Sequence, residues 1–235
     1  MPKKTSVKEY LGTLTKISKA ITSDLYLEDI LKLIVSLTAS VMGAKICSLW
    51  LLDEEKKELK IRATQAFSQE YLKERVLRLG EGVVGSVAKD KNPMIIEDVS
   101  KDERYKEKKL AEKEHLISML SVPMLVKDRV IGVINVYTVE LREFSKSDID
   151  LLSAVANQAA VAIENTELIV RTKVIEEELE TRKKVERAKG ILMESRDITE
   201  DEAYGLLRKS SMNKRVSMKE IANAIILSYE IGGKN

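Results

Sequence analysis

A stretch of 44 residues, from Lys146 to Lys189, contains neither glycine nor proline. These are the two residues that most readily interrupt a helix, because glycine loses much backbone entropy there and proline lacks an amide donor. An uninterrupted α-helix over this stretch would be about 66 Å long, whereas roughly 30 Å already spans a small domain. The stretch therefore predicts a long helix that connects two parts of the chain.

A coiled-coil spacing runs along the middle of this stretch, with steps of four, three, four, three and four residues. The positions are Val161, Asn165, Leu168, Thr172, Ile175 and Leu179. An asparagine buried at such a seam favours a parallel two-stranded register. We therefore expect a homodimer joined by a coiled-coil linker over 166–184. The alternative is a solvated helix that only connects two domains.

The totals of the chain exclude several classes of protein. Its 235 residues suit one or two domains, and 44% hydrophobic residues are ample for a core. The net charge of +2 means that any surface for a polyanion must be local. A single cysteine excludes a disulfide framework. Without a signal peptide or an apolar run of about eighteen residues, we expect a cytoplasmic protein with no membrane partner.

The C-terminal residues predict a module of three helices. Thr199 is followed by Glu202, and Ser217 by Glu220. Each pair is a capping box, in which hydroxyl and carboxylate satisfy the amide groups that a helix start leaves unpaired. The expected helices end near Met193, span about 200–209 and span about 218–229.

Basic side chains between Ala203 and Lys219 have no acidic residue among them. A small helical module with such a concentrated basic surface is typical of nucleic-acid binding, although a solvated helix face is the alternative. Lys189 is added because it ends the long helix beside Gly190, where RNA could approach closely. The expected RNA-binding residues are Lys189, Arg208, Lys209, Lys214, Arg215 and Lys219. Tyr204 either packs in the core with Leu207, which its helix face favours, or stacks on a base.

The same residues resemble a known family. AKGILM at 188–193, EDEAY at 200–204 and LLRKSSM at 206–212 are similar to the ANTAR domain. That resemblance implies the RNA-binding domain of a bacterial transcription antiterminator. The family usually has Asn and two basic residues directly before the apolar residue that opens the last helix. Here that set lies two residues earlier, at 213–215.

The first 140 or so residues alternate between helical and strand patterns. We expect helices over 5–22 and 24–42, strands over 44–53, 58–67, 93–99, 116–126 and 129–139, and a glycine-bounded loop leading into a short helix over 80–90. The glycines of GEGVVG are more typical of a tight turn than of a nucleotide loop, since the nucleotide-loop spacing and lysine are missing. Ser145 with Asp148 is a third capping box, at the start of the long helix.

Residues 78–105, 121–137 and 144–168 resemble the GAF domain in the order of their motifs. The resemblance covers roughly 24–165 and implies an α+β fold. An antiparallel sheet would carry a dimerising helical bundle on one face and a ligand pocket on the other. The expected domains are an N-terminal helix (1–23), the GAF domain (24–165), the coiled-coil linker (166–184) and the ANTAR domain (185–235).

The resemblance also places a small-molecule pocket, roofed near 105–116. The side chains expected to face it are Trp50, Tyr105, Met119, Asn135 and Tyr137. Asn135 is a polar residue in an apolar strand, so it either touches a ligand or is satisfied by the backbone. The residue signature of cyclic-nucleotide GAF domains is absent, and no pattern names the ligand or a cofactor.

Catalysis is not expected, because one histidine and one cysteine cannot supply a convincing nucleophile–base set. Buried packing is the usual role of a cysteine such as Cys47. A mononuclear iron site is a weaker alternative, built from His115 with Asp98, Asp102, Glu114 and Cys47. We expect no metal.

The sequence thus favours a dimeric, ligand-responsive regulator that holds two hairpins of leader RNA and prevents an overlapping terminator. The alternative is a protein–protein signalling module in which the GAF domain only dimerises the chain.

Overall fold

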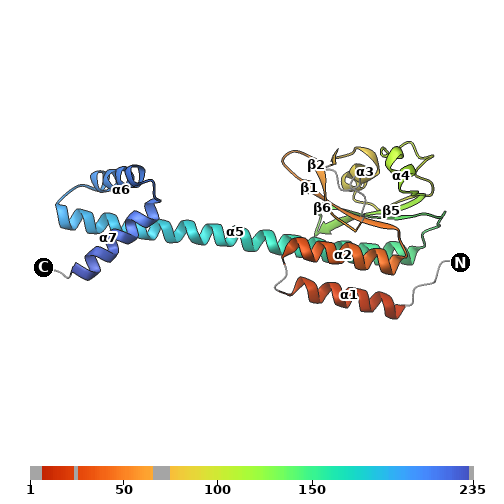
Figure 1. The fold of residues 1–235 in the computed structure, drawn as a ribbon, viewed down its shortest axis with the longest axis horizontal. Coiled ribbons are helices and arrows are strands. Elements are labelled where there is room, and N and C mark those ends of the chain that lie inside the picture. The colour runs from red at the N-terminus through yellow and green to blue at the C-terminus, as the bar shows by residue number, and fades with distance from the viewer. Residues whose placement is uncertain (1–6, 24–25, 66–74, 233–235) are drawn as a thin grey trace. The chain divides into compact units, whose positions relative to one another are not determined.

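A computed structural model describes residues 7–23, 26–65 and 75–232 of the chain (Figure 1). The chain forms two compact units, residues 1–166 and residues 167–235. The predicted long helix is confirmed: α5 is continuous from Lys146 to Arg196, so it begins in the first unit and ends in the second. It continues past Gly190 and beyond the expected end near Met193, because a single glycine lowers helix stability by only about 1 kcal/mol.

The N-terminal unit is built on one six-stranded antiparallel sheet, which confirms the expected α+β class. Its strand order is β3-β2-β1-β6-β5-β4. The strands are β1 (Ile46–Asp53), β2 (Glu58–Thr64), β3 (Val76–Arg78), β4 (Met94–Ile96), β5 (Ser118–Val126) and β6 (Arg129–Thr138). The hairpins β1–β2 and β5–β6 are the two predicted ones. Sequence reasoning missed β3, an edge strand too short to show an alternating pattern.

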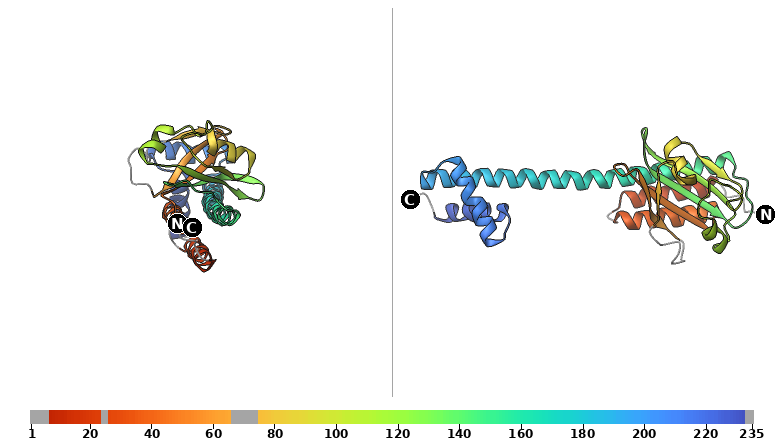
Figure 2. Two further views of the ribbon diagram at one scale, coloured as in Figure 1. Left: turned by 90° about the vertical axis from the view of Figure 1, so that its right-hand side faces the viewer. Right: turned by 90° about the horizontal axis from the view of Figure 1, so that it is seen from above.

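One face of the sheet is covered by α2 (Leu27–Met42) and the first part of α5, with α1 (Val7–Ile21) packed on α2 (Figures 1 and 2). Ile34, Leu152 and Ile134 come from α2, α5 and β6 and lie in one continuous apolar core. Each such side chain contributes roughly 1.5–3 kcal/mol when it is fully buried. Residues 5, 6, 24, 66 and 67 of the expected elements lie outside the described residues.

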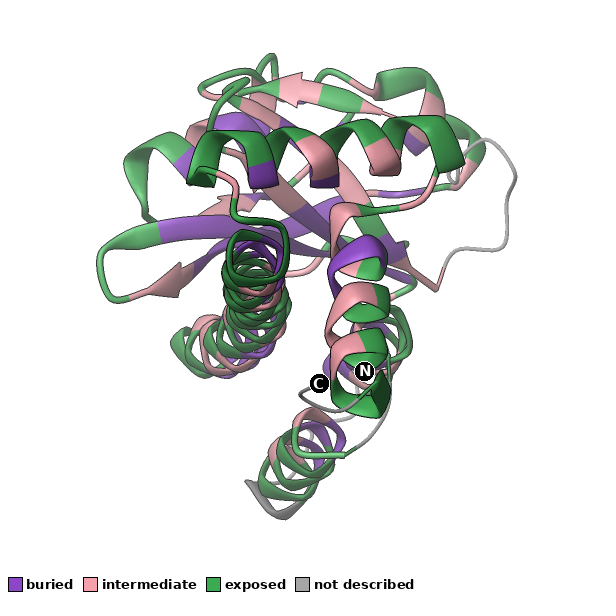
Figure 3. Cartoon of the chain, turned by 90° about the vertical axis from the view of Figure 1, so that its left-hand side faces the viewer, coloured by how far each residue is buried: buried purple, intermediate pink, exposed green. Residues whose placement is uncertain are grey.

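The opposite face carries α3 (Gly82–Asp90) and α4 (Lys108–Lys113) over a second apolar core. The central strands β1, β5 and β6 are therefore buried along most of their length. Figure 3 colours buried residues purple, and they are frequent in the sheet. The predicted tight turn before α3 is present, since Gly80 and Gly82 have positive φ angles of 86° and 63°. Because helices cover both faces of the sheet, most side chains of these three strands lie in one of the two apolar cores.

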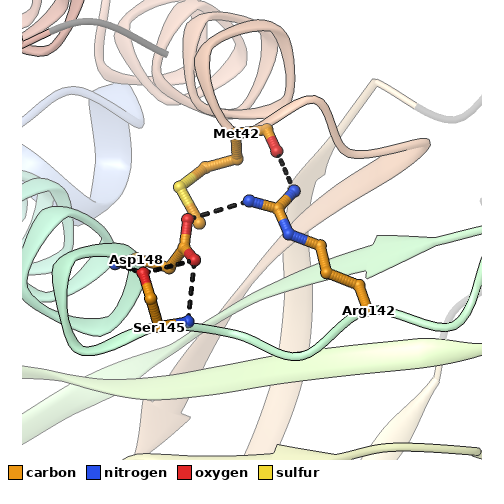
Figure 4. A network of polar contacts seen from close by, with 4 residues as sticks. All are labelled: Met42, Arg142, Ser145 and Asp148. Carbon is orange, nitrogen blue, oxygen red and sulfur yellow. Dashed lines mark hydrogen bonds and ion pairs between the residues drawn. The ribbon is translucent and has the colours of Figure 1, made fainter. Parts of the chain in front are cut away.

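A polar network fixes the point where α5 starts (Figure 4). Ser145 and Asp148 form the predicted capping box, in which the Ser145 amide and hydroxyl donate to the Asp148 carboxylate at 2.8 Å each. Arg142 donates to the other oxygen of Asp148 at 2.8 Å and also to the Met42 carbonyl at the end of α2. The network therefore ties the beginning of α5 to the end of α2.

The C-terminal unit contains the end of α5 together with α6 (Glu200–Lys214) and α7 (Met218–Gly232). Both predicted capping boxes are present, with Glu202 bonded to Thr199 and Glu220 bonded to Ser217. The three helices share a small core that includes Leu192, Leu207 and Ile221. The expected end of the second helix at residue 209 is wrong, because α6 continues to Lys214 and closes at Arg215 in a left-handed cap.

Candidate functional sites

The basic residues of α6 are open to solvent and carry no carboxylate partner. Arg208, Lys209, Lys214 and Arg215 are all exposed. Among the described residues, none of the four lies within ion-pair distance of an acidic side chain. The basic side chains of the C-terminal half of α6 and its cap are therefore free to meet an anion. We call these four residues the α6 basic set.

Lys189 has a different environment from the one expected. Its residue is only 7% exposed, and its ammonium lies 2.9 Å from Glu186 and 2.6 Å from Glu200. The hydrogen bond to Glu200, and then that to Glu186, raises the pKa of Lys189 above its usual value. Since Glu200 is the first residue of α6, this contact fastens α6 to α5.

Lys219 is likewise held in an ion pair. Its ammonium lies 2.7 Å from Glu180 on α5, and Lys184 reaches the same carboxylate at 2.8 Å. Hydrogen bonds from Lys184 and Lys219 lower the pKa of Glu180 to about 2. Arg187 of α5 pairs with Glu230 of α7 at 2.6 Å. We call Lys184, Arg187, Lys189 and Lys219 the paired set, because their charges are already matched within the module.

Tyr204 lies on the surface of α6, so the expectation that favoured the core is wrong. Its residue is 45% exposed, whereas its neighbour Leu207 is fully buried. The buried positions of α6 are Ala203 and Leu207, one turn apart, and Tyr204 stands at the edge of that stripe. Tyr204 is therefore available to a partner outside the module.

The five expected pocket residues gather on one face of the sheet. Trp50, Tyr105, Met119 and Tyr137 belong to the apolar core beneath α3 and α4, and Asn135 lies on the same face of β6 as Tyr137. All five are buried. The rings of Tyr105 and Tyr137 meet edge to face, with centroids 6.3 Å apart. The structure thus brings the five residues together, and their contact with a ligand stays a prediction.

Two serines that sequence reasoning missed accompany Asn135. Ser48 of β1 and Ser121 of β5 lie directly opposite Asn135 on its two neighbouring strands, and all three are fully buried. Ser121 donates to the Asn135 side-chain oxygen at 2.6 Å, and the Asn135 amide donates to Ser48 at 3.5 Å. Trp50 also donates to Ser48, at 3.3 Å. Asn135 is therefore satisfied by side chains rather than by backbone.

A surface hollow of about 570 Å³ lies against this core, lined by residues 103 and 105–110. It occupies part of the expected roof, and Tyr105 belongs both to its lining and to the buried core. Tyr105 therefore links the surface to the predicted pocket residues.

The iron-site alternative is not assembled in the part of the chain that the structure describes. No group of three or more histidine, cysteine, aspartate and glutamate side chains there could hold a metal ion. Cys47 lies in the apolar core beneath α2 and α5, where burial raises the pKa of its thiol. Asp98 and Asp102 are bonded to Lys101 and Arg104 respectively.

No described helix combines the length and apolarity required to cross a bilayer.

Several apolar side chains of the middle of α5 are exposed in the single chain. Val161, Leu168, Ile175 and Leu179, all on the expected seam, are between 42% and 64% exposed. Val170 and Val174 are exposed as well, although the seam spacing does not include them. Together these side chains form an apolar surface on α5 that the rest of the described chain does not cover.

Comparison with known proteins agrees with this organisation. The GAF domain family matches residues 25–164, and the ANTAR domain family matches residues 173–226. Among solved structures, the GAF domain of an Acinetobacter phosphoenolpyruvate-protein phosphotransferase is 28% identical, with a TM-score of 0.61, over 71% of this chain and 99% of that chain. The corresponding GAF domain from Coxiella burnetii is 22% identical, with a TM-score of 0.64, over 70% of this chain and 98% of that one.

Two curated relatives match stretches of the chain of different length. The phosphoenolpyruvate-dependent phosphotransferase system of Escherichia coli is 25% identical over 158 residues, which are 67% of this chain and 21% of that protein. The transcriptional regulatory protein PdtaR of Mycobacterium tuberculosis is 35% identical over 86 residues, which are 37% of this chain and 41% of that protein. The matches thus span only part of either relative. The chain belongs to the GAF domain family and carries an ANTAR domain after its GAF domain.

Proposed function

We propose that the protein is an RNA-binding transcription regulator, in which the ANTAR domain contacts RNA, the GAF domain senses a ligand and the α5 seam joins two copies of the chain. The α6 basic set is the observation that carries this proposal. These four cations lie on consecutive turns and the cap of one helix without carboxylate partners. Exposed, uncompensated cations raise the local potential and attract phosphates, whereas paired cations contribute little.

The RNA contact is assigned to the α6 basic set, with the paired set in a structural role. A phosphate that approached Lys189 would have to displace both Glu186 and Glu200. Lys219 would have to leave Glu180. Because Arg208, Lys209, Lys214 and Arg215 meet no such competition, they contact the phosphate backbone.

The homodimer is assigned to the α5 seam. Isolated helices with so narrow an apolar stripe are marginal, and a second copy would cover the exposed leucines and isoleucine. Two ANTAR domains would then bind two hairpins of leader RNA together, with a gain in avidity over either hairpin alone. Binding of the paired hairpins would prevent an overlapping terminator from forming.

The ligand site is assigned to the face of the sheet beneath α3 and α4. The row Ser48, Asn135 and Ser121 supplies convergent polar groups in an otherwise apolar core, a combination typical of small-molecule sites. A ligand would enter by way of the hollow beside Tyr105. The proposed function is that of a non-enzymatic cytoplasmic regulator.

RNA that crosslinks to the protein tests the proposal most broadly. Ultraviolet crosslinking followed by sequencing is expected to recover leader RNA with two adjacent hairpins. Replacing Lys214 and Arg215 with alanine should reduce recovery, while the matched change of Lys183 and Lys173, both exposed on α5, should not. The protein–protein alternative predicts instead that no RNA class is enriched and that both double variants recover the same background.

A further inference from the structure

The exposed residues of α6 change in charge from its beginning to its end. Its first turn carries three acidic side chains, Glu200, Asp201 and Glu202, and its second half carries the α6 basic set. Phosphate is attracted to the basic end and repelled from the acidic end. An RNA strand bound along α6 would therefore place its phosphates near the C-terminal end of the helix. Its bases, which carry no charge, would lie nearer the first turns.

Tyr204 lies between these two ends and is partly exposed. Tyr204, Arg208 and Met212 are spaced by four residues, so they lie on the same side of the helix. All three are exposed, Met212 at 68%. Next to Tyr204, the space where a side chain of Gly205 would begin is not occupied by any other part of the module. Tyr204, at 45% exposure, therefore presents part of its side chain to solvent beside an open position.

We infer that Tyr204 is the stacking platform for an unpaired base in the loop of a bound RNA hairpin. This inference rests on the proposed function and names the residue that contacts a base rather than phosphate. Unstacked loop bases are recognised in proteins by aromatic side chains, and every base has a face suited to this contact. Arg208 lies one turn away, where its guanidinium reaches the phosphate of the stacked nucleotide while Asp201 keeps further phosphates away.

The probe is a pool of RNA stem-loops with a randomised loop, from which the parent protein selects its tightest members. Tyr204→Leu keeps an apolar side chain but removes the ring, and should weaken binding of the selected RNA by roughly five- to hundredfold. Tyr204→Phe keeps the ring and should bind within about twofold of the parent. The dependence of affinity on salt should stay unchanged in both, because no phosphate contact is lost.

Tyr229→Leu is the matched control, because it makes the same substitution at another tyrosine of the module, one bonded to Glu194 at 3.4 Å. It should leave RNA affinity unchanged. A selected RNA in which the stacked nucleotide is made abasic should bind the parent and Tyr204→Leu equally well. Thermal unfolding of each variant measures whether the module itself is altered.

Equal affinity of the parent and Tyr204→Leu for the selected RNA would overturn the inference while leaving the proposed function intact. So would an equal loss in Tyr204→Leu, Tyr204→Phe and Tyr229→Leu, since that pattern reports a weakened module. If the parent enriches no stem-loop at all, the proposed function fails, and this inference fails with it.

Discussion

The α6 basic set and the paired set contain four cations each within one small module, yet their surroundings differ. Every member of the paired set lies within 3 Å of a carboxylate, and the contacts of Arg187, Lys189 and Lys219 join α5 to α6 and α7. No member of the α6 basic set has such a partner among the described residues. A count of basic residues therefore does not locate an anion-binding surface. Some of the basic side chains hold the three helices together, and only the others are open to an anion.

The largest expected effect follows from removing the α6 basic set. Replacing Arg208, Lys209, Lys214 and Arg215 together with alanine should lower affinity for hairpin RNA on the order of a hundred- to a thousandfold. The four side chains are exposed, so helix content and unfolding temperature should change little. Filter binding at fixed salt, with circular dichroism of the same samples, measures both.

A control variant that loses the same four positive charges elsewhere in the chain tests whether their position on α6 matters. Lys16, Lys19, Lys89 and Lys109 are four exposed lysines of the N-terminal unit. Their replacement with alanine should leave affinity within about twofold of the parent, because the proposal assigns no phosphate contact to them. Equal losses in the two variants would mean that RNA responds only to overall charge.

A second expected effect leaves both sets of cations untouched. Leu168→Glu with Ile175→Glu should convert the dimer to a monomer and weaken binding of a two-hairpin RNA by about ten- to hundredfold, through loss of avidity. Binding of a single hairpin should be unchanged. Light scattering gives the mass of each variant at micromolar concentration.

The matched control for the seam places the same charges on the other side of α5. Val170→Glu with Val174→Glu alters two exposed positions outside the seam spacing and should remain dimeric. A parent that is monomeric at micromolar concentration, or a control that loses its dimer as readily as the seam variant, contradicts the assignment.

Breaking the paired set should change stability rather than RNA contact. Lys189→Met keeps much of the buried stem but leaves Glu200 and Glu186 without their shared cation. Its unfolding temperature should fall by several degrees, roughly 4–8 °C for a domain of this size. Lys183→Met, at an exposed neighbouring position on the same helix, should show no shift in differential scanning calorimetry.

The smallest expected effect is a dependence of stability on pH. Lys184 and Lys219 lower the pKa of Glu180 from 4.5 to about 2, so its ion pairs are complete above pH 4.5 and are lost as the pH falls toward 2. Glu180→Gln should be less stable than the parent at pH 7, and the difference should fade between pH 4.5 and 2. A difference that is constant over this range would show that the ionised carboxylate does not stabilise the module.

Local patterns in the sequence predict most of the fold. The three capping boxes, the two hairpins and the helix without glycine or proline all depend on residues within a few positions of one another, and each is present. The short edge strand β3 was missed because three residues give no period to detect. The end of α6 differs from the expected residue 209, because the helix continues to Lys214 and closes with a left-handed cap at Arg215.

The candidate sites were less predictable, because their environment comes from distant residues. Glu186 lies three positions before Lys189 and was visible as a partner in the sequence, but Glu200 reaches Lys189 only through the turn between α5 and α6. Ser48 and Ser121 join Asn135 only through the register of three strands. Tyr204 and Leu207 share a helical neighbourhood in the sequence, yet only one of them faces the core.

The salt dependence of RNA binding tests the division between the two sets most directly. Two double variants carry the same chemical change: Lys214→Met with Arg215→Met in the α6 basic set, and Arg187→Met with Lys219→Met in the paired set. For each, affinity for one hairpin RNA is measured from about 50 to 200 mM salt. The α6 variant should flatten the logarithmic slope by about 1.4 to 1.8, while the paired-set variant keeps the slope of the parent. A parent slope in the α6 variant, with a flattened slope in the paired-set variant, would contradict the assignment of RNA contact to α6.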